Sequence, residues 1–375
     1  MDLGLTSDQE LLRSTTQQFL HDTAPLNVVR TWADLASGYE EDWWKRGANL
    51  GWTSLLVSEA NGGGSISGDG IGDLAIIAEE MGALVSPGPL SPVNIVAQTL
   101  SLDAPQEMAS EVLPGLLAGE HVAAWCLAEP GGDAVPAGGD LIVQRVGSDV
   151  VISGIKSPVE SGAEAQWLLV TARSPEGMIQ CLLLSNTPGV EVTPLCGLDL
   201  TRRFATVQFH DVHLSGSAIV NSGHIAEGAI ERQLRTALIL QCAESVGACN
   251  RVFDFTVEYA FDRYSFGRPL ASYQALKHRF ADMKMWLESA QAITAEAVNS
   301  VGVDAEGAGE TVRIAKAYVG DRCPELIQDC IQMHGGIGVT WDHDLHLYLR
   351  RVVLHRQTYG DPTSQRELIA LHSAP

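Results

Sequence analysis

Basic residues are scarce in this sequence. It has 24 Lys and Arg against 46 Asp and Glu, which gives a formal net charge of −22. A chain this acidic repels the phosphates of nucleic acids, so a nucleic-acid partner is not expected. An anionic cofactor is still compatible with this charge, provided that locally placed Arg, Lys and backbone N–H groups bind it.

Long apolar runs and secretory features are also missing. No stretch approaches the roughly 18 uninterrupted apolar residues of a membrane-spanning helix, so we expect no membrane span. The opening residues, MDLGLTSDQELL, lack the basic and apolar regions of a secretory signal. The seven cysteines are an odd number without a CxxC pair, which favours free thiols in a reducing cytoplasm. We therefore expect a cytoplasmic protein of two or three domains.

Three kinds of sequence follow one another along the chain. Residues 1–119 read as an all-helical domain. Residues 120–218 contain short runs rich in Val, Ile, Leu, Thr and Phe, separated by turn residues, and predict an antiparallel β domain. Residues 219–375 return to long helices and predict a helical bundle. No β-α-β alternation occurs, which argues against a Rossmann fold and favours an α+β multidomain class.

Several helices can be predicted in detail. Ser7 with Glu10 three residues later matches a capping box at the start of the first helix. Apolar residues recur at helical spacing in two later segments, as expected for the core-facing stripes of a bundle. The first stripe comprises Leu276, Phe280, Met283, Leu287, Ala290, Ile293 and Ala297, and the second Val312, Ala315, Val319, Cys323, Leu326 and Cys330.

Two loops of the bundle region could bind an anionic ligand. RYSFGRPLASYQ (263–274) joins two long helices and combines an Arg, a Ser hydroxyl and a helix start, which suits a pyrophosphate. QMHGGIGVTW (332–341) places glycines after a helix, where the backbone can approach a ligand closely. The alternatives are an ordinary helix connection for the first loop and an ordinary helix end for the second. CLAEPGGDA (126–134) and GIKSPVESGAEAQWLLV (154–170) are strand connections with the same two interpretations.

Together these four stretches resemble the acyl-CoA dehydrogenase family, and the resemblance covers essentially the whole chain. Its most specific parts are Arg263-x-x-Phe266-Gly267 with Gln274, and Gln332-x-x-Gly335-Gly336. The resemblance implies an N-terminal helical domain, a central β domain, a C-terminal four-helix bundle and FAD as the cofactor.

The resemblance also assigns roles to these residues. Arg263, Ser265, Phe266 and Gln274 are expected to hold the FAD pyrophosphate and neighbouring groups, while Gln332, Gly335 and Gly336 approach its adenosine end. In this family such groups serve the flavin of an adjacent subunit, so at least a dimer is implied. The family's reaction removes a proton α to an acyl-CoA thioester and passes a hydride to the flavin. Electron-transfer flavoprotein is the expected electron acceptor.

The catalytic base of the family has no obvious counterpart. The usual Glu in a Tyr-Glu-Gly-Thr pattern falls on Gly360, beside Asp361, and the alternative position early in the first bundle helix falls on Ala237. Glu244 lies in an almost apolar stretch of that helix. Because desolvation raises the pKa of buried carboxyl groups, such an acid suits a general base. The alternative is a structural Glu paired with an Arg of a neighbouring helix.

The β region departs from the family pattern as well. The usual Thr-Glu-Pro-Gly-Ala-Gly-Ser-Asp is shortened to Ala128–Asp133, and the usual Trp-Ile-Thr/Ser becomes Pro158-Val159-Glu160. An aromatic and hydroxyls that normally meet the flavin ring are therefore lost. If it points inward, Glu160 would oppose an electron-rich reduced flavin.

These departures have a pattern, because the groups for a neighbour's flavin are intact while those for the chain's own flavin ring and base are altered. We expect one subunit of an α2β2 hetero-oligomer, similar to actinobacterial steroid or acyl-CoA dehydrogenases. A self-sufficient homomeric enzyme with Glu244 as base, and a non-redox acyl-CoA-binding protein, remain alternatives. The acid–His–acid triplet Asp342–Asp344 reads as a solvated helix start, since no further ligand converges on it to make a metal site.

Overall fold

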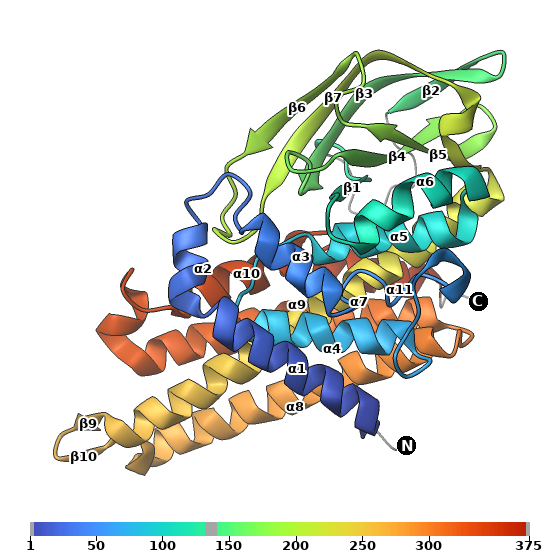
Figure 1. The fold of residues 1–375 in the computed structure, drawn as a ribbon. Coiled ribbons are helices and arrows are strands. Elements are labelled where there is room, and N and C mark those ends of the chain that lie inside the picture. The colour runs from blue at the N-terminus through green and yellow to red at the C-terminus, as the bar shows by residue number, and fades with distance from the viewer. Residues whose placement is uncertain (1–3, 132–140, 373–375) are drawn as a thin grey trace. The chain divides into compact units, whose positions relative to one another are not determined.

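The computed structural model describes residues 4–131 and 141–372 (Figure 1). Within these residues, the chain groups into two compact units. Unit 1 contains the residues up to Arg30, Ala75–Ser86 and the residues from Leu238 onward, and unit 2 contains Thr31–Leu74 and Pro87–Ala237. No helix in the described ranges is both long enough and apolar enough to cross a membrane.

The order of elements along the chain is helices, then strands, then helices, as the sequence predicts. The first helices are α1 (Ser7–Thr23), α2 (Leu26–Trp32), α3 (Glu41–Asn49), η1 (Glu59–Asn61), α4 (Gly70–Ala83), α5 (Leu90–Asp103) and α6 (Gln106–Leu117). The later elements are α7 (His224–Asp262), β9 (Tyr264–Ser265), β10 (Arg268–Pro269), η3 (Leu270–Ser272), α8 (Gln274–Gly302), α9 (Ala308–His334), η4 (Gly335–Val339), α10 (Leu345–Gln357) and α11 (Pro362–His372). The fold class is therefore confirmed, while the domain boundaries at residues 119 and 218 stay predictions.

The cap of the first helix lies one residue earlier than predicted. Thr6, not Ser7, is the N-cap: its side chain accepts a hydrogen bond from the backbone of Gln9, whose side chain bonds back to Thr6. The predicted capping box at Ser7 and Glu10 is thus wrong by one position. Both pairs fit the same four-residue pattern, so the sequence does not discriminate between them.

Unit 1 is a bundle in which α8 packs along α9, and α9 packs against α10 and α11. The predicted stripe on α9 is buried at all six positions, and most of the α8 stripe is buried too. In Figure 1 the β9–β10 hairpin lies at the tip formed by α7 and α8. The bundle therefore presents the 263–274 connection at one end.

Two glycines allow α4 and α7 to touch backbone to backbone in unit 1. A Cβ added to Gly82 would lie 2.0 Å from the carbonyl oxygen of Glu244, and one added to Gly247 would lie 1.8 Å from that of Glu79. No side chain fits at either position. This crossing fixes the segment of α7 that carries Glu244.

Unit 2 is built on a sheet. Its strands are β1 (Ala123–Cys126), β2 (Ile142–Val146), β3 (Asp149–Glu160), β4 (Trp167–Ser174), β5 (Gly177–Leu184), β6 (Val190–Leu195), β7 (Phe204–Leu214) and β8 (Ile219–Ser222), with η2 (Gly216–Ala218) before the last. The order across the sheet is β6-β7-β3-β2-β4-β5-β8, and β1 pairs with β4. Most pairs are antiparallel, as predicted, but β4 pairs in parallel with both β1 and β2.

The alternation predicted for β7 is present. Ala205, Val207 and Phe209 face the core, and the alternation shifts at Asp211, which has a left-handed φ of 48°. The register with β3 slips at the same place, between Ile152 and Gly154. A bulge therefore lets the strand keep its apolar side chains inward on both sides of the break.

Candidate cofactor-binding site

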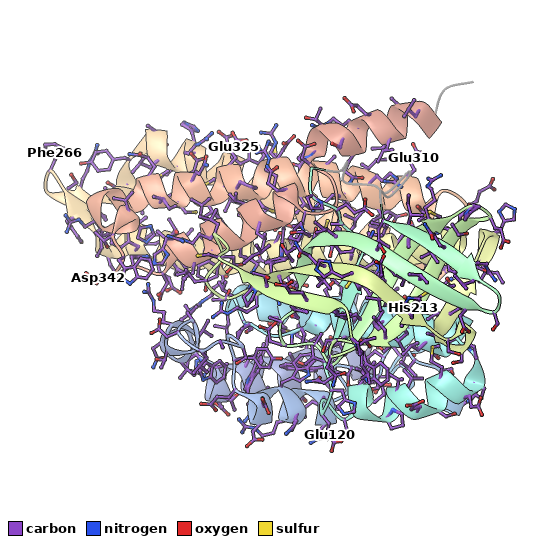
Figure 2. The ribbon with its side chains drawn as sticks, turned by 90° about the horizontal axis from the view of Figure 1, so that it is seen from above. Glu120, His213, Phe266, Glu310, Glu325 and Asp342 are labelled. Carbon is purple, nitrogen blue, oxygen red and sulfur yellow. The ribbon has the colours of Figure 1, made fainter. Side chains whose placement is uncertain are left out.

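The loop between α7 and α8 is a tight hairpin with an exposed tip. Phe266 and Gly267 have φ values of 50° and 80°, the left-handed backbone of a two-residue turn between β9 and β10. The side chain of Phe266 is 98% exposed, and Figure 2 shows it at the far end of the helices. An aromatic side chain this exposed is a candidate contact for a ligand or partner.

Contacts within the loop hold its backbone and leave Arg263 exposed. The hydroxyl of Tyr273 donates to the carbonyl of Ser265 at 2.6 Å, and the Arg268 guanidinium lies 3.9 Å from the centre of the Tyr273 ring. The backbone N–H of Leu270 donates to the carbonyl of Arg263 at 2.9 Å. Within the described part of the chain, the Arg263 side chain makes no ion pair. A fixed backbone with an unpaired guanidinium suits a phosphate group.

The start of α8 adds backbone donors beside this Arg. Gln274 is the first residue of the helix and is exposed, and the preceding cap residue, Tyr273, gives no side-chain hydrogen bond to the first turn. The first amides of the helix are thus available to an anion. The structure therefore brings Arg263, Ser265, Phe266 and Gln274 into one short loop.

The glycine loop follows directly on α9. Gly335 has a φ of +63°, and an added Cβ at Gly335 or Gly336 would meet nothing within 4 Å. A Cβ on Gly338, by contrast, would lie 2.6 Å from the carbonyl of Ile331. Gly338 is therefore needed for packing, whereas Gly335 and Gly336 leave open backbone, with exposed Gln332 one turn before them. This cradle fits a nucleotide that approaches the backbone closely.

Both loops lie at the same end of unit 1. The ring of Tyr259, in the last turns of α7, stacks on that of His334, the last residue of α9, with centroids 4.3 Å apart. Tyr259 lies four residues before Arg263, and His334 directly precedes Gly335. In Figure 2, Phe266 and Asp342 accordingly appear at one end, and Glu310, at the start of α9, toward the other.

Glu244 is buried and paired. Its Oε2 lies 2.8 Å from the guanidinium of Arg351 on α10, and their side chains are 3% and 0% exposed. Arg351 also donates to the carbonyls of Val85 and Ser86. The Nε2 of His355 lies 3.5 Å from the same carboxylate oxygen. This is the geometry of the structural alternative, in which the Glu pairs with an Arg of a neighbouring helix.

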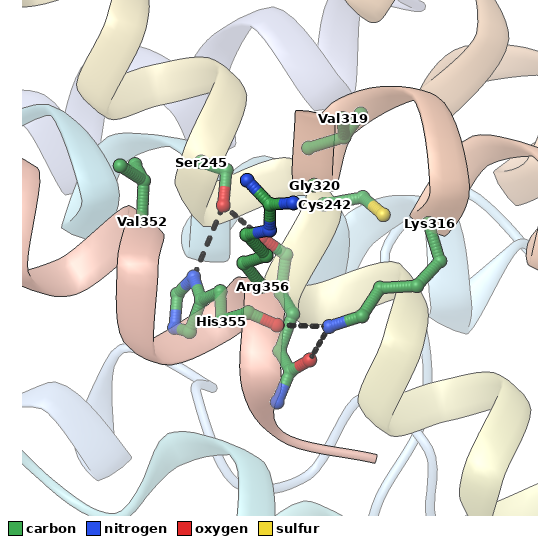
Figure 3. A pocket seen from close by; sticks show the side chains of 9 residues that line it. Cys242, Ser245, Lys316, Val319, Gly320, Val352, His355 and Arg356 are labelled. Carbon is green, nitrogen blue, oxygen red and sulfur yellow. Dashed lines mark hydrogen bonds between the residues drawn. The ribbon is translucent and has the colours of Figure 1, made fainter. Parts of the chain in front are cut away.

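A second polar group, shown in Figure 3, adjoins Glu244 through His355. Ser245 lies 3.1 Å from Nδ1 of His355, and Lys316 donates to Oε1 of Gln241 at 2.5 Å and to the carbonyl of His355. Burial lowers the pKa of Lys316 to about 8. These groups line a small pocket between α7, α9 and α10, together with Cys242, Val319, Gly320, Val352 and Arg356. The neighbourhood of Glu244 is thus a closed polar network of side chains.

Asp361, beside the usual position of the base, is a helix cap. Its Oδ1 accepts hydrogen bonds from the backbone N–H of Ser364 at 2.8 Å and from its hydroxyl at 2.9 Å, at the start of α11. The backbone hydrogen bond from Ser364 lowers the pKa of Asp361. Gly360 and Ala237 are buried and carry no acid. Asp361 therefore serves to start α11.

Comparison with known proteins identifies the family of the chain. Residues 6–120 match the sequence profile described as acyl-CoA dehydrogenase, N-terminal domain, and residues 225–373 match acyl-CoA dehydrogenase, C-terminal domain. The chain belongs to the acyl-CoA dehydrogenase family.

Individual acyl-CoA dehydrogenases are similar over nearly the whole chain. The acyl-CoA dehydrogenase IpdE2 of Mycolicibacterium smegmatis is 26% identical over 96% of this chain and 97% of its own length. The ChsE4–ChsE5 complex of Mycobacterium tuberculosis superposes with a TM-score of 0.90 at 22% identity, covering 100% of both chains. A glutaryl-CoA dehydrogenase of Mycobacterium smegmatis, solved in complex with FADH2, gives 0.89 at 21% identity, covering 98% of this chain and 95% of the other.

FAD is the cofactor of acyl-CoA dehydrogenases, and the two loops of unit 1 fit its nucleotide portion. The open glycine backbone and the exposed Arg263 are the groups that a pyrophosphate and an adenosine need. When bound, FAD supplies the hydride acceptor of the reaction.

In unit 2, residues in or beside the two altered segments, Ala128–Asp133 and Pro158–Glu160, contact each other. Lys156 is buried and donates to Oε1 of Glu129 at 2.6 Å and to the carbonyl of Leu127 at 3.0 Å. Glu160 forms an ion pair, in which its carboxylate lies 3.7 Å from the guanidinium of the buried Arg202. The charge of Glu160 is thus offset within unit 2. Gly132 and Asp133 lie outside the described residues.

In the acid–His–acid triplet, Asp344 and His343 contact different partners. Asp344 pairs with Arg30 at 2.7 Å, and His343 packs edge-on against His334 with ring centroids 4.7 Å apart. The exposed Trp341 stacks on His346 at 4.6 Å. Among the described residues, no three His, Cys, Asp or Glu side chains are grouped to hold a metal ion.

Three residues that shape this site are not among those predicted from the sequence. Arg351 neutralises Glu244, Lys316 anchors the neighbouring network, and Tyr259 joins the two loops. A charged residue on the apolar stripe of a helix is the signal that points to such buried partners. Lys316 follows Ala315 of the predicted α9 stripe, and Arg351 begins the run Arg351-Val352-Val353-Leu354.

Proposed function

We propose that this chain is one subunit of a hetero-oligomeric acyl-CoA dehydrogenase, in which its two loops hold the FAD of an adjacent subunit. The observation that carries the proposal is a contrast within unit 1. The nucleotide-facing groups, Arg263 and the Gly335–Gly336 backbone, are open. The acids at or near the base positions are engaged, Glu244 by Arg351 and Asp361 by Ser364. The chain is thus equipped to bind a nucleotide and poorly equipped to remove a proton.

In this assembly each group of the chain has a limited task. Arg263 and the first amides of α8 bind the pyrophosphate, and the Gly335–Gly336 backbone receives the adenosine end. A carboxylate of the adjacent subunit would remove the proton α to the acyl-CoA thioester, and FAD would supply the acceptor for the β hydride. Electron-transfer flavoprotein then accepts the electrons. The similarity to the ChsE4–ChsE5 complex supports a heteromeric partner at the level of the fold.

Two alternatives make different demands on the same residues. A homomeric dehydrogenase with Glu244 as base requires that carboxylate to leave Arg351 and His355, which costs the chain a buried ion pair. A non-redox acyl-CoA-binding protein would have no use for the open glycine loop.

Expression with and without a partner separates these possibilities. The chain is produced alone and together with an acyl-CoA dehydrogenase-like neighbour from the same genome, and visible spectra and acyl-CoA-dependent dye reduction are measured. We expect the chain produced alone to be colourless or insoluble. The co-expressed complex should be yellow and active in dye reduction. A yellow homo-oligomer that reduces the dye contradicts it, and a colourless chain that binds acyl-CoA in both cases favours the non-redox alternative.

A further inference from the structure

We propose that His334 is a positioning residue that fixes the hairpin loop Arg263–Gln274 and the glycine loop Gly335–Val339 relative to each other. The inference rests on the proposed function, in which both loops contact one FAD of an adjacent subunit. His334 acts on that nucleotide through its neighbours, because its own ring is buried behind the loops.

The ring of His334 is held in one orientation. Its Nδ1 lies 2.8 Å from the carbonyl oxygen of Cys330, one turn earlier on α9. Because a carbonyl only accepts, this nitrogen carries the hydrogen and donates it. One face of the ring is then stacked on Tyr259, with centroids 4.3 Å apart and planes 20° apart. An oriented ring of this kind transmits a displacement of one helix end to the other.

Short contacts lead from this stack to each loop. On the glycine side, the N–H of Gly335 donates to the carbonyl of Gln332, and Gly338 packs so closely that an added Cβ would lie 3.0 Å from Cβ of His334. On the hairpin side, the carbonyl of Tyr259 accepts the N–H of Arg263 at 2.8 Å. The hydroxyl of Tyr259 also lies 3.5 Å from the carbonyl of His334. A single pair of rings therefore spans the two loops.

The rings of His343 and Phe255 also pack against His334. His343 meets His334 edge-on at 4.7 Å, and Phe255 lies 5.8 Å from His334 and 5.9 Å from His343. The N–H of Leu345 donates to Nδ1 of His343, which fixes that ring as well. Two loops held at a fixed separation bind a long ligand without the entropic cost of ordering each of them.

The charged groups around the stack favour its neutral form. Burial lowers the pKa values of His334 and His343, and each imidazolium would repel the other. Asp344, the next residue in the chain, opposes this shift of His343, while Arg30 on α2 and His346 on α10 add to it. Because the folded pKa is lowered, the neutral stack is complete above the ordinary pKa of about 6.5 and is lost as the pH falls through the lowered value.

Hydrogen exchange of the chain without cofactor tests the link directly. His334→Ala removes the ring, His334→Phe keeps a ring without the Nδ1 donor or the titration, and Val312→Ala removes a buried side chain elsewhere on α9 as a matched control. We expect His334→Ala to speed exchange about tenfold in both peptides, 263–273 and 335–341. Val312→Ala should change neither. Tyr259→Leu, which removes the ring from the other side of the stack, should reproduce the effect on both peptides.

Affinity for FAD in the assembled complex supplies the second readout. His334→Ala should raise the dissociation constant about tenfold and leave turnover at saturating FAD unchanged, whereas His334→Phe should recover most of the affinity and lose its decline at acid pH. Faster exchange confined to 335–341, or an equal effect of Val312→Ala, overturns the proposal. Because exchange is measured without FAD, failure of the proposed function appears separately, as an assembly that binds no FAD while both peptides still respond to His334→Ala.

Discussion

The carboxylate of Glu244 lies 2.8 Å from the guanidinium of Arg351, and both side chains are buried. Arg351 extends the pair to the carbonyls of Val85 and Ser86, where Val85 has a left-handed φ of 50° that β-branched residues rarely adopt. The pair therefore joins α7 and α10 to the end of α4. This relationship gives the acid in an almost apolar helix a structural partner.

Substitution of each partner separates structure from catalysis. Glu244→Gln in an active assembly should retain FAD and turnover per bound flavin, because the amide still accepts from Arg351. Arg351→Ala should destabilise the fold by about 3–5 kcal/mol, since it leaves a buried carboxylate uncompensated. Denaturant unfolding and flavin-normalised dye reduction measure these effects. The exposed pair of Lys284 with Glu288 provides the control, where Lys284→Ala should cost at most about 1 kcal/mol. Loss of turnover in Glu244→Gln with flavin still bound would restore Glu244 as base.

A methyl group added to the open glycine backbone should weaken nucleotide binding without destabilising the fold. In Gly336→Ala the new Cβ meets nothing in the chain, but it occupies the space through which a ligand approaches. We expect at least about tenfold weaker FAD binding in the assembly, with an unfolding midpoint close to that of the wild type. Gly228→Ala, also in open space but on α7, is the matched control and should leave FAD affinity unchanged. Equal affinities of Gly336→Ala and wild type would remove the glycine loop from the cofactor site.

Arg263 should contribute to binding through charge. Arg263→Ala removes an exposed guanidinium without an ion pair in the described part of the chain, so the free energy of unfolding should change by less than about 0.5 kcal/mol. The FAD dissociation constant should rise about tenfold or more, and its dependence on salt should weaken. Titration of FAD into the apo assembly at two salt concentrations measures both, with Lys284→Ala as an exposed cationic control. An effect of the same size in both variants would show only a general change in charge.

The crossing of α4 and α7 should tolerate no side chain at Gly247. An added Cβ would lie 1.8 Å from the carbonyl of Glu79, which belongs to the backbone and cannot rotate away. We therefore expect Gly247→Ala to cost about 3 kcal/mol or more in urea unfolding. Gly228→Ala, in the same helix, should instead gain about 0.5–1 kcal/mol from helix propensity. Similar midpoints for the two variants would contradict the close approach.

The buried Lys316 predicts a specific pH dependence. Burial lowers its pKa to about 8, below the 10.5 of an exposed lysine, so the unfolded chain binds more protons between these values. Stability should therefore rise with pH across this window, by up to about 3 kcal/mol relative to Lys316→Met, which lacks the titration. Urea unfolding of both proteins at pH 7.5 and above pH 9 measures the difference. A difference that is independent of pH would show that Lys316 keeps an ordinary pKa.

Most of the fold could be predicted from the regular spacing of apolar residues along the sequence. The α9 stripe from Val312 to Cys330 is predictable because apolar residues that recur every 3.6 positions over several turns form a continuous face only on a helix. The N-cap was harder, since Thr6 with Gln9 and Ser7 with Glu10 satisfy the same pattern one residue apart. The parallel pairing of β1 with β4 could not be predicted either, because strand order depends on contacts between distant segments.

For the site, local motifs were predictable and partners were not. The open backbone at Gly335 and Gly336 follows from glycine itself, and the tight turn at Phe266–Gly267 lies within the quoted motif. The partner of Glu244 lies 107 residues away. The apolar run after Arg351 indicates a buried arginine, but no local pattern pairs it with Glu244. The stack of Tyr259 on His334 likewise joins two helices that only the bundle brings together.

The flavin content of the co-purified complex tests the central claim most directly. If this chain lends its loops but holds no flavin ring of its own, the complex should contain one FAD for each pair of unlike subunits, counted by native mass spectrometry and absorbance. Arg263→Ala in this chain should then release that FAD from the partner's site. Two FAD for each pair of unlike subunits, or FAD bound by this chain alone, would contradict the account.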